Sequence, residues 1–414
     1  MINTDQVKIE QLLSRGVENV YPNREFLAKL LSLGKRLTLY TGYDPTAPTL
    51  HIGHAITMLK LREFQDLGHK VIMLIGDFTG MIGDPTDKSA TRKQLTRQQV
   101  LNNCQEYKKQ ASTILNFKGK NPVEVKYNSK WLAKLNFADV LELTSHFTVQ
   151  QMLVRDMFQE RMKQSRSIHV HEFLYPVMQA YDCVAMDVDG EVGGNDQTFN
   201  MLAGRDLMKQ LKNKEKFVLT TKLLTDSSGL KMGKTEGNMI SLSDSAKDMY
   251  GKTMALSDDL IVRSFEIATR IPVERVKEIE RLLKSGANPR DLKAELAYEI
   301  VKIYYGETEA KVAREEFDKI YTKKDYPMTP VVIKARVKPD NLLGILWELN
   351  LSLELGRFPS KTEAKRLIEQ GSIKVNDQVV KDWAKKIDVE NGQKIDIKIG
   401  GKHPGEYSIT WLDK

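Results

Sequence analysis

The sequence contains little cysteine and no long apolar run. Its two cysteines among 414 residues, Cys104 and Cys183, do not form a C-x-x-C pair, which argues against a disulfide framework and a cysteine-based zinc site. No uninterrupted apolar stretch is long enough to span a bilayer. The first residues, MINTDQVKIEQLL, carry charges where a secretory signal needs an apolar core. We therefore expect a soluble protein of the reducing cytoplasm with no membrane partner.

Histidine is also scarce, yet two of the seven histidines stand together. His51 and His54 flank Gly53 in the segment PTLHIGHA, just before a helix-like run. If a strand ends near Thr41 and a helix begins near His51, both imidazoles lie at a helix N-terminus, where free backbone N–H groups favour phosphate. Gly53 would let a flat ring approach the backbone. The segment predicts a nucleotide site; the alternative is a capped helix with two incidental histidines.

A second candidate phosphate site is the segment GLKMGKTEGN at residues 229–238. Lys231, Lys234 and Thr235 place two ammonium groups and a hydroxyl between glycines that permit motion. Such a loop can close over a polyphosphate, although lysine and glycine are also common in exposed loops. Together with the paired histidines, the segment predicts a site for a nucleotide that carries several phosphates.

The charge of the chain favours an anionic partner. The formal net charge is +8, and residues 91–130 hold nine lysines and arginines but only two acidic residues. A smaller basic surplus follows between Arg205 and Lys222. Such clusters are typical of nucleic-acid-binding surfaces, and the alternative is a set of solvated helix faces.

The first half of the chain predicts a parallel α/β sheet. RLTLYTGYD and KVIMLIGDF are short apolar runs, and the helix-patterned AITMLKLREFQDLG lies between them. This is the strand, helix, strand order of a Rossmann-like, doubly wound fold. We expect this domain to cover residues 1–225.

The second half predicts further parts. From about residue 246 the pattern is helical, and Pro272, Gly286 and Pro289 mark helix boundaries. A hairpin is expected to turn at Asn376 and Asp377. The expected parts are the lysine loop with an all-α domain over 226–325, a proline-punctuated linker over 326–340 and a small α+β module over 341–414.

The two phosphate-site motifs resemble the signature motifs of class I aminoacyl-tRNA synthetases. The resemblance narrows to the bacterial tyrosyl-tRNA synthetases, because other segments resemble that family in the expected order. These are LYTGYDPTAPTLHIGHA, GDFTGMIGDPTDKSATR, EFLYPVMQAYD, VGGNDQ and the C-terminal GRFPSKTEAKRLIEQGSIKVNDQVV. The last of them resembles the alpha-L RNA-binding module. The first domain is thereby identified as the catalytic domain.

The resemblance implies a tyrosine pocket. Tyr40 and Asp182 match the pair that hydrogen-bonds the substrate phenol, whereas Tyr175, Gln179 and Asp84 match the groups that hold the α-ammonium. The implied tyrosine-binding set is Tyr40, Asp84, Tyr175, Gln179, Asp182 and Gln197.

The resemblance also implies an ATP site and a tRNA-binding helix. The ATP-binding set is Gly42, Asp44, Thr46, His51, Gly53, His54, Asp196, Lys231 and Lys234. The catalytic set is Thr46, His51, His54, Lys88, Arg92, Lys231, Lys234 and Thr235, in which Lys88 and Arg92 approach the pyrophosphate. The tRNA-binding set is Arg357, Lys361, Lys365 and Arg366.

Some positions depart from the family pattern. The lysine loop reads Lys-Met-Gly-Lys-Thr in place of the commoner Lys-Met-Ser-Lys-Ser, and both lysines and a hydroxyl remain. Asn195 and Thr41 replace residues that are commoner in the family, so ribose contacts are expected to differ in detail. His169 and His171 could suggest a metal pair, but no third ligand is nearby in the sequence, and an exposed loop is expected with no metal site.

The implied function is that of a tyrosine–tRNA ligase. L-Tyrosine would react with ATP to give tyrosyl-adenylate, with Mg2+ assisting, and the tyrosyl group would then pass to the 3' end of tRNA(Tyr). The carboxylate of tyrosine is already ionised at pH 7, so no general base is needed. The resemblance also implies a homodimer. FTVQQMLVRDMFQERM at residues 147–162 is an apolar-striped candidate interface helix, and the alternative is ordinary core.

Three alternatives compete with this interpretation. A small-molecule nucleotidylyltransferase would share the fold and the histidine motif but would not require the helical region or the C-terminal module. A non-catalytic RNA-binding relative should have lost some of His51, His54, Lys231 and Lys234, all of which are present. The tryptophan enzymes are nearest in fold but lack the C-terminal module and the pairing of Tyr40 with Asp182.

Overall fold

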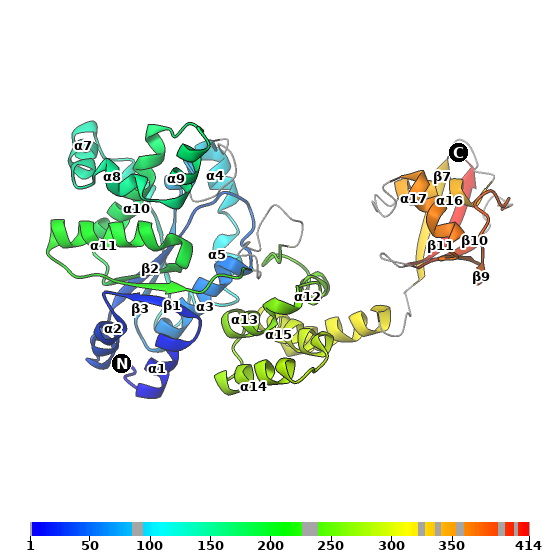
Figure 1. Ribbon diagram of the computed structural model, residues 1–414, viewed down its shortest axis with the longest axis horizontal. Coiled ribbons are helices and arrows are strands. Elements are labelled where there is room, and N and C mark those ends of the chain that lie inside the picture. The colour runs from blue at the N-terminus through cyan, green and yellow to red at the C-terminus, as the bar shows by residue number, and fades with distance from the viewer. Residues whose placement is uncertain are drawn as a thin grey trace. The chain divides into compact units, whose positions relative to one another are not determined.

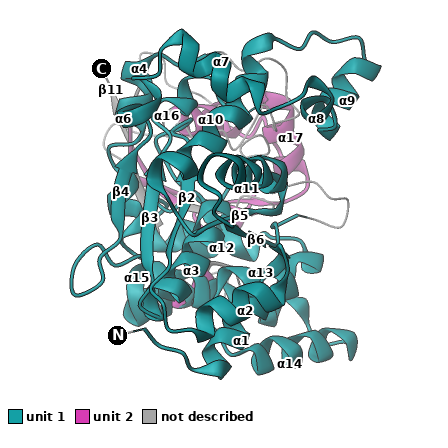
Figure 2. Cartoon of the chain, turned by 90° about the vertical axis from the view of Figure 1, so that its left-hand side faces the viewer, with its two compact units in different colours: residues 1–314 teal, residues 315–414 magenta. Residues whose placement is uncertain are grey.

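A computed structural model gives the fold of most of the chain (Figure 1). The described residues are 2–84, 94–225, 239–321, 328–335, 341–352, 360–387, 394–400 and 405–413. The chain forms two compact units, Met1–Arg314 and Glu315–Lys414, which are teal and magenta in Figure 2. Each unit has its own sheet and its own hydrophobic core.

The first unit is built on a six-stranded sheet in the order β1-β6-β5-β2-β3-β4. Its strands are β1 Val17–Tyr21, β2 Thr38–Tyr43, β3 Lys70–Ile75, β4 Glu124–Tyr127, β5 Gly190–Gly194 and β6 Phe217–Thr221. Strands β6, β5, β2, β3 and β4 run parallel, whereas β1 pairs antiparallel with β6. The parallel sheet confirms the predicted fold class.

The strand order of this sheet reverses between β2 and β5. From β2 the chain moves to β3 and β4 on one side, and it then returns to β5 and β6 on the other. Open α/β sheets bind ligands in the crevice outside the carboxyl ends of their strands at such a switch point. The fold therefore places a ligand site beyond the ends of β2 and β5.

Helices cover both faces of the sheet, because its central strands are apolar on both faces. The helices of this part are α1 Gln6–Ser14, α2 Arg24–Ser32, α3 Ile52–Asp66, α4 Arg97–Asn103, α5 Tyr107–Ala111, α6 Ser129–Leu132, α7 Phe137–Ser145, α8 Val149–Leu153, α9 Asp156–Lys163, α10 Val170–Met186 and α11 Thr198–Lys212, with short 3-10 turns at η1 Thr79–Met81 and η2 Asn195–Gln197. Leu39, Val71 and Met73 share a core with α3. Tyr40 and Ile72 point to the other face, where they share a core with α10 and α11. Tyr40 is thereby directed toward the helix that carries Tyr175, Gln179 and Asp182.

A helical region completes the first unit and confirms the predicted break. Its helices are α12 Ala246–Met254, α13 Ile261–Ala268, α14 Val273–Lys284 and α15 Pro289–Tyr321, with η3 Asp258–Leu260. Pro272 precedes α14, Gly286 adopts a φ of 88°, and Pro289 begins α15. Gly306, with φ 84° and ψ 173°, interrupts α15.

Arg15 ties the helical region to the start of the chain. Its guanidinium donates to the carbonyl oxygens of Phe265, Glu266, Thr269 and Ile271 at distances of 2.6 to 3.2 Å. Carbonyl groups at a helix C-terminus lack intrahelical partners, and the five N–H donors of arginine can satisfy several of them at once. The end of α13 is therefore held by a residue from the N-terminal segment.

The second unit is a small α+β fold. Its elements are β7 Met328–Ala335, α16 Leu342–Ser352, α17 Lys361–Glu369, β8 Ile373–Val375, β9 Gln378–Val379, β10 Lys394–Ile399 and β11 Gly405–Asp413, and the sheet order is β7-β11-β10-β8-β9. Asn376 and Asp377 both have positive φ between β8 and β9. This is the backbone of a tight hairpin turn, as predicted.

Strand β7 lies within the segment that the sequence predicts to be a linker. It pairs in parallel with β11 along its whole length. Pro330 is tolerated because β7 is an edge strand, where a missing N–H can face away from the ladder. Residues 328–335 therefore belong to the sheet of the second unit, whereas the domain limits as a whole remain a prediction.

Candidate active site

His51 and His54 cap the N-terminus of α3. The Nδ1 atom of His51 accepts a hydrogen bond from the Gly53 N–H at 3.1 Å, and the Nδ1 atom of His54 accepts one from the His51 N–H at 3.1 Å. A backbone N–H can only donate, so both Nδ1 atoms are unprotonated and each Nε2 atom of the neutral rings carries the proton. The ring centres are 3.8 Å apart. The predicted capping of the helix is therefore observed, and the caps leave each Nε2 as an N–H donor at the helix start.

Gly53 is required by the His51 ring. A Cβ atom at position 53 would lie 2.9 Å from the His51 Cε1 atom, closer than real Cβ contacts. The sequence suggested that Gly53 admits a flat ring of the ligand. The structure supplies a nearer reason, because the ring that approaches this glycine is the side chain of His51.

The end of β2 is fixed by Asp44. One of its carboxylate oxygens accepts from the Thr79 hydroxyl at 2.6 Å, and the other accepts from the Tyr175 hydroxyl at 2.8 Å. Gly76 leaves the space that this requires, since a Cβ atom there would lie 1.9 Å from the Asp44 carboxylate. Asp44 thus joins β2, η1 and α10 at the switch point. Gly42 lies in β2, and the N–H of Thr46 donates to the Asp44 carbonyl at 2.8 Å.

Asp182 is a buried carboxylate held by two donors. Trp131 Nε1 donates to one oxygen at 2.7 Å, and Asn128 Nδ2 donates to the other at 3.2 Å. Burial raises the pKa of Asp182 well above its ordinary value, and these two hydrogen bonds oppose the rise. The carboxylate is therefore fixed in orientation inside an apolar wall, ready to accept one further hydrogen bond.

Tyr40 places a hydroxyl in the same buried region. Its hydroxyl oxygen is buried and makes no hydrogen bond of good geometry among the described residues, although the Glu191 carboxylate lies close to it. Burial raises the pKa of Tyr40, and the charges of Glu191, Cys183 and Asp182 and the contact with Glu191 raise it further. A buried hydroxyl without a partner costs about 1 to 3 kcal/mol. Such a group in the core of an otherwise well-bonded protein points to a ligand that supplies the missing partner.

The residues matched to the α-ammonium site form a polar cluster. Gln197 Nε2 donates to one Asp84 oxygen at 2.6 Å, and Arg155 Nη2 lies 3.5 Å from the other. Gln179 Nε2 donates to Glu191 at 3.2 Å. Asp196 and Gln197 belong to η2, directly after β5. The structure thus brings the tyrosine-matched residues to the α10 side of the sheet, around the switch point.

Two departures from the family pattern have structural roles. Thr41 is buried, and its hydroxyl donates to the Val192 carbonyl at 2.6 Å. Asn195 accepts from Asn19 Nδ2 at 3.3 Å. The Thr41 side chain therefore ties β2 to β5, and the Asn195 side chain ties η2 to β1.

The base of the lysine loop is anchored beside His51. Lys231, Lys234 and Thr235, like Lys88 and Arg92, lie outside the described residues, so their predicted roles stay predictions. The chain that follows the loop is described: Ile52 N–H donates to the Ile240 carbonyl at 3.0 Å, and Leu242 N–H donates to the Leu50 carbonyl at 2.9 Å. The two segments thus flank His51 with a short antiparallel bridge.

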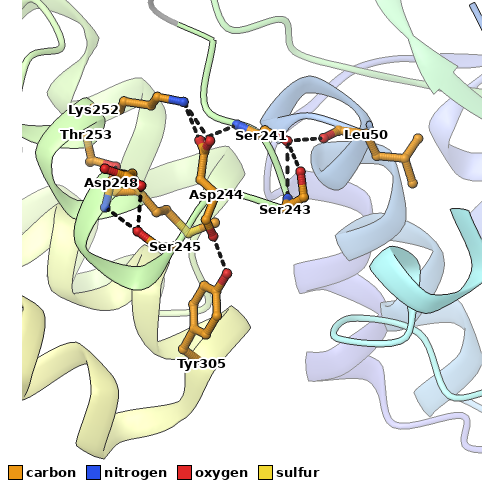
Figure 3. A network of polar contacts seen from close by, with 10 residues as sticks. Leu50, Ser241, Ser243, Asp244, Ser245, Asp248, Lys252, Thr253 and Tyr305 are labelled. Carbon is orange, nitrogen blue, oxygen red and sulfur yellow. Dashed lines mark hydrogen bonds and ion pairs between the residues drawn. The ribbon is translucent and has the colours of Figure 1, made fainter. Parts of the chain in front are cut away.

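A polar network holds this bridge on the helical region (Figure 3). The Asp244 carboxylate accepts from the Ser241 N–H at 2.8 Å and from Lys252 Nζ at 2.7 Å, and the Tyr305 hydroxyl donates to the Asp244 carbonyl. The Ser241 hydroxyl faces the Leu50 carbonyl at 3.4 Å. Residues from α12 and α15 therefore set the position of the chain that enters the histidine motif.

Three of the four matched tRNA-binding residues lie on α17. Lys361 and Lys365 are placed over the rings of Trp347 and Trp383, at 5.7 and 4.1 Å from the ring centres. Arg366 forms an ion pair with Glu363 at 2.6 Å. The fourth, Arg357, lies outside the described residues. These contacts are compatible with a solvated helix and with a phosphate-binding face.

No cluster of three or more histidine, cysteine or acidic side chains that could hold a metal occurs among the described residues. The expected exposed loop is wrong for His171, which lies in the first turn of α10; His169 is the N-cap residue of that helix, and the two rings are 5.7 Å apart. Likewise, no helix in the described part of the chain is both long and apolar enough to cross a membrane.

Several residues around the pocket were not found from the sequence. They are Asn128, Trp131, Arg155, Glu191 and Lys216. For Glu191 and Lys216 a signal existed, because each is a charged residue inside or beside a short strand that is otherwise apolar or glycine-rich. For the others, which approach the pocket only through tertiary packing, no local pattern was available.

Comparison with known proteins agrees with this geometry. The family model for class I tRNA synthetases of the tryptophan and tyrosine type matches residues 32–322, and the S4 domain model matches residues 351–391. Among solved structures, a C-terminally truncated mitochondrial tyrosyl-tRNA synthetase of Aspergillus nidulans superposes with a TM-score of 0.63 at 25% identity, covering 76% of this chain and 94% of that one.

Curated relatives match over almost the full length. The tyrosine–tRNA ligase of Moorella thermoacetica is 42% identical over 388 residues, which is 92% of each chain. That of Thermotoga maritima is 43% identical over 385 residues, again 92% of each chain. With the matching family models, this similarity shows that the chain belongs to the bacterial tyrosyl-tRNA synthetases, a family of class I tRNA synthetases.

Proposed function

We propose that the chain works as a tyrosine–tRNA ligase through the pocket at the switch point. It activates L-tyrosine with ATP to tyrosyl-adenylate and then transfers the tyrosyl group to the 3' end of tRNA(Tyr). The observation that supports this pocket most directly is the buried hydroxyl of Tyr40, which makes no hydrogen bond of good geometry among the described residues, in the region of the buried Asp182 carboxylate. A substrate phenol would satisfy both groups, since it donates one hydrogen bond and can accept another.

The remaining pocket residues hold the amino-acid end. Asp84, Tyr175 and Gln179 bind the α-ammonium, and Gln197 lies beside them through its bond to Asp84. The fixed phenol site and the fixed ammonium site together position the substrate carboxylate. Because that carboxylate is already ionised at pH 7, it attacks the α-phosphorus of ATP without a general base.

Activation then depends on donors that meet the charge growing on the phosphates. The Nε2–H groups of His51 and His54 are oriented by their caps, and Thr46 lies just beyond β2. Lys88, Arg92, Lys231, Lys234 and Thr235 complete the proposed catalytic set. Such donors act most strongly when they stabilise the transition state more than the ground state.

The remaining ATP positions lie at the carboxyl edge of the sheet. Gly42 lies in β2, Asp44 directly follows it, Gly53 lies in the first turn of α3, and Asp196 follows β5. ATP is expected to enter as its Mg2+ complex, in which the ion neutralises phosphate charge. Mg2+ prefers oxygen ligands and is commonly held by substrate phosphates. The proposed histidine and lysine donors would bind the phosphates, and the phosphate oxygens would hold the Mg2+ ion.

We also propose a cytoplasmic homodimer. Large apolar side chains are exposed on α7, on α8 and α9 and at the start of α10, and Val170 is 79% exposed. The exposed set is Phe137, Leu141, Val149, Val154, Met162 and Val170. The predicted single helix over 147–162 is wrong, because α8 ends at Leu153 and α9 begins at Asp156. Exposed apolar side chains on several successive elements favour an interface between subunits.

The decisive test of the activity is amino-acid-dependent exchange of pyrophosphate into ATP. We expect exchange with tyrosine and none above background with the other nineteen amino acids. Exchange that depends on tryptophan, or an absence of exchange with every amino acid, would overturn the proposed function. Exchange without any amino acid would instead indicate a small-molecule nucleotidylyltransferase.

Replacement of Asp182 tests the phenol site. Asp182→Ala removes the acceptor of the phenol in a desolvated pocket, which costs about 1 to 3 kcal/mol for a neutral partner and more for a charged one. We expect kcat/KM for tyrosine to fall by roughly tenfold to several hundredfold, while the rate with phenylalanine changes little. The measurement is the ratio of the two exchange rates.

Asp77 provides the matched control. It is also a buried aspartate, and it accepts from the Ser129 N–H at 2.9 Å and the Ser129 hydroxyl at 2.6 Å. Asp77→Ala should lower stability and leave the preference for tyrosine over phenylalanine unchanged. If both variants kept that preference, the phenol site would lie elsewhere.

A further inference from the structure

Glu191 and Lys216 form a buried ion pair that the mechanism above does not use. Their side chains are 3% and 0% exposed, and Lys216 Nζ donates to Glu191 Oε2. A buried pair is weak evidence for stability, because apolar residues of similar volume often serve equally well. Its position beside the tyrosine pocket therefore calls for another explanation.

The pair contacts residues from both ends of the pocket. Glu191 stands opposite Tyr40 on the neighbouring parallel strand, so the two side chains share a face of the sheet. Glu191 Oε1 accepts from Gln179 Nε2 at 3.2 Å. Lys216 Nζ lies 5.8 Å from the centre of the Tyr40 ring. The two oxygens of one carboxylate thus accept from the lysine and the glutamine, and the same carboxylate lies close to the Tyr40 hydroxyl.

The bond to Glu191 fixes which way the Gln179 amide points. A carboxylate can only accept, so Gln179 must turn its NH2 group toward Glu191 and its carbonyl oxygen away. No other hydrogen bond engages the Gln179 side chain among the described residues. The carbonyl oxygen is the atom of Gln179 that can accept from an ammonium group, whereas a reversed amide would present two donors to it.

Lys216 keeps the Glu191 carboxylate in this role. Burial alone would lower the pKa of Lys216. The charges of Cys183 and Glu191 and the hydrogen bonds to them raise that pKa above its ordinary value, so the lysine is charged. The space around it is closed: a Cβ atom at Gly204 would lie 2.9 Å from Lys216 Nζ. The lysine therefore donates to Glu191 Oε2, and Glu191 Oε1 remains to accept from the glutamine.

We propose that the Glu191 carboxylate, held in an ion pair by Lys216, is a positioning residue. It orients the Gln179 amide so that the Gln179 carbonyl accepts from the α-ammonium of tyrosine. This inference rests on the proposed role of Gln179 in the tyrosine pocket. It makes the ion pair responsible for selecting an α-amino acid over the same acid without its amino group.

Glu191→Gln tests the orientation of the Gln179 amide directly. The new side chain has nearly the shape of glutamate, but its hydrogen bond with Gln179 is expected to run in the opposite direction. Lys216 needs an acceptor, so it takes the carbonyl of the new amide, whose NH2 then faces Gln179 and turns the Gln179 amide around. We expect KM for tyrosine to rise about tenfold or more, with little change in KM for ATP or in kcat. The inhibition constant of 3-(4-hydroxyphenyl)propionate, which lacks the ammonium, should stay near that of the parent.

The double variant Glu191→Gln with Lys216→Met supplies a rescue. Without the lysine, the new amide is free to turn its carbonyl to Gln179 again, so KM for tyrosine should return most of the way to the parent value. A purely structural role predicts the opposite, since the second substitution would add to the damage. Thermal unfolding of each variant shows that the comparison is made on folded protein.

Glu63→Gln is the matched control. Lys60 and Glu63 form another Lys–Glu pair at 2.6 Å in which Lys60 is 4% exposed, and it lies in α3. Its substitution should alter none of the four constants: the KM values for tyrosine and ATP, kcat and the inhibition constant of the propionate. The inference is overturned if Glu191→Gln leaves KM for tyrosine unchanged, or if it weakens tyrosine and the propionate equally. If the parent itself shows no tyrosine-dependent exchange, the proposed function fails and this inference fails with it.

Discussion

Removal of residues 322–414 is expected to abolish charging of tRNA(Tyr) and to leave tyrosine-dependent pyrophosphate exchange nearly unchanged. All residues proposed for adenylate formation, from Tyr40 to Thr235, lie in the first unit. The S4 domain match and the basic residues of α17 lie in the second. The two half-reactions should therefore separate when the chain is cut after α15, because adenylate formation involves only small substrates.

The position of the cut matters. A chain ending at residue 340 would keep β7 and lose its partner β11, which leaves an unpaired strand edge that favours aggregation. A chain ending at Tyr321 keeps α15 whole and stops where the synthetase family model ends, at residue 322. Residues 1–321 are therefore the fragment to compare with the full chain.

The salt dependence of tRNA binding shows whether the second unit binds phosphate. Each lysine or arginine that stops neutralising a phosphate should reduce the slope of log K against log salt by about one unit. Lys361→Ala in the full chain is expected to reduce the slope in this way without altering exchange. If the truncated chain charged tRNA as well as the full chain, the second unit would have no part in transfer.

The central strands and the histidine helix could be predicted because their signals are local. The apolar runs that became β2 and β3 and the helix pattern between them lie within one continuous segment. The order of the strands could not be predicted, since β5 returns beside β2 only through long-range pairing. Strand β7 was missed for the same reason: its partner, β11, lies far along the chain, and the prolines of this segment suggested a linker.

The site shows a similar division. The histidine pair and the residues matched through the family carry recognisable chemistry in short segments. Trp131 and Asn128, which hold the Asp182 carboxylate, come from the segment after β4 and meet α10 only in the folded chain. The identity of a residue can suggest its chemistry, whereas the orientation of its atoms depends on neighbours that the sequence does not place.

His51→Asn is expected to lower the rate of adenylate formation strongly while sparing the fold. Asparagine is a favourable N-cap residue, and its side-chain oxygen can replace Nδ1 as the acceptor of the Gly53 N–H. It has no atom in place of Nε2, so the donor aimed at the phosphates is removed. Removing one such donor commonly raises the barrier by about 2.7 to 4 kcal/mol, roughly a hundred- to thousandfold in rate.

His51→Ala separates the two roles of the side chain. It removes both the cap and the donor, so its rate should fall as far as that of His51→Asn, and its stability should be lower by about 1 kcal/mol. Pre-steady-state adenylate formation and thermal unfolding measure the two effects independently. Tyrosine affinity should be retained in both variants, because the proposed role of the imidazole is to bind phosphate and not the amino acid. An asparagine variant that formed adenylate at the parent rate would show that His51 serves only to begin α3.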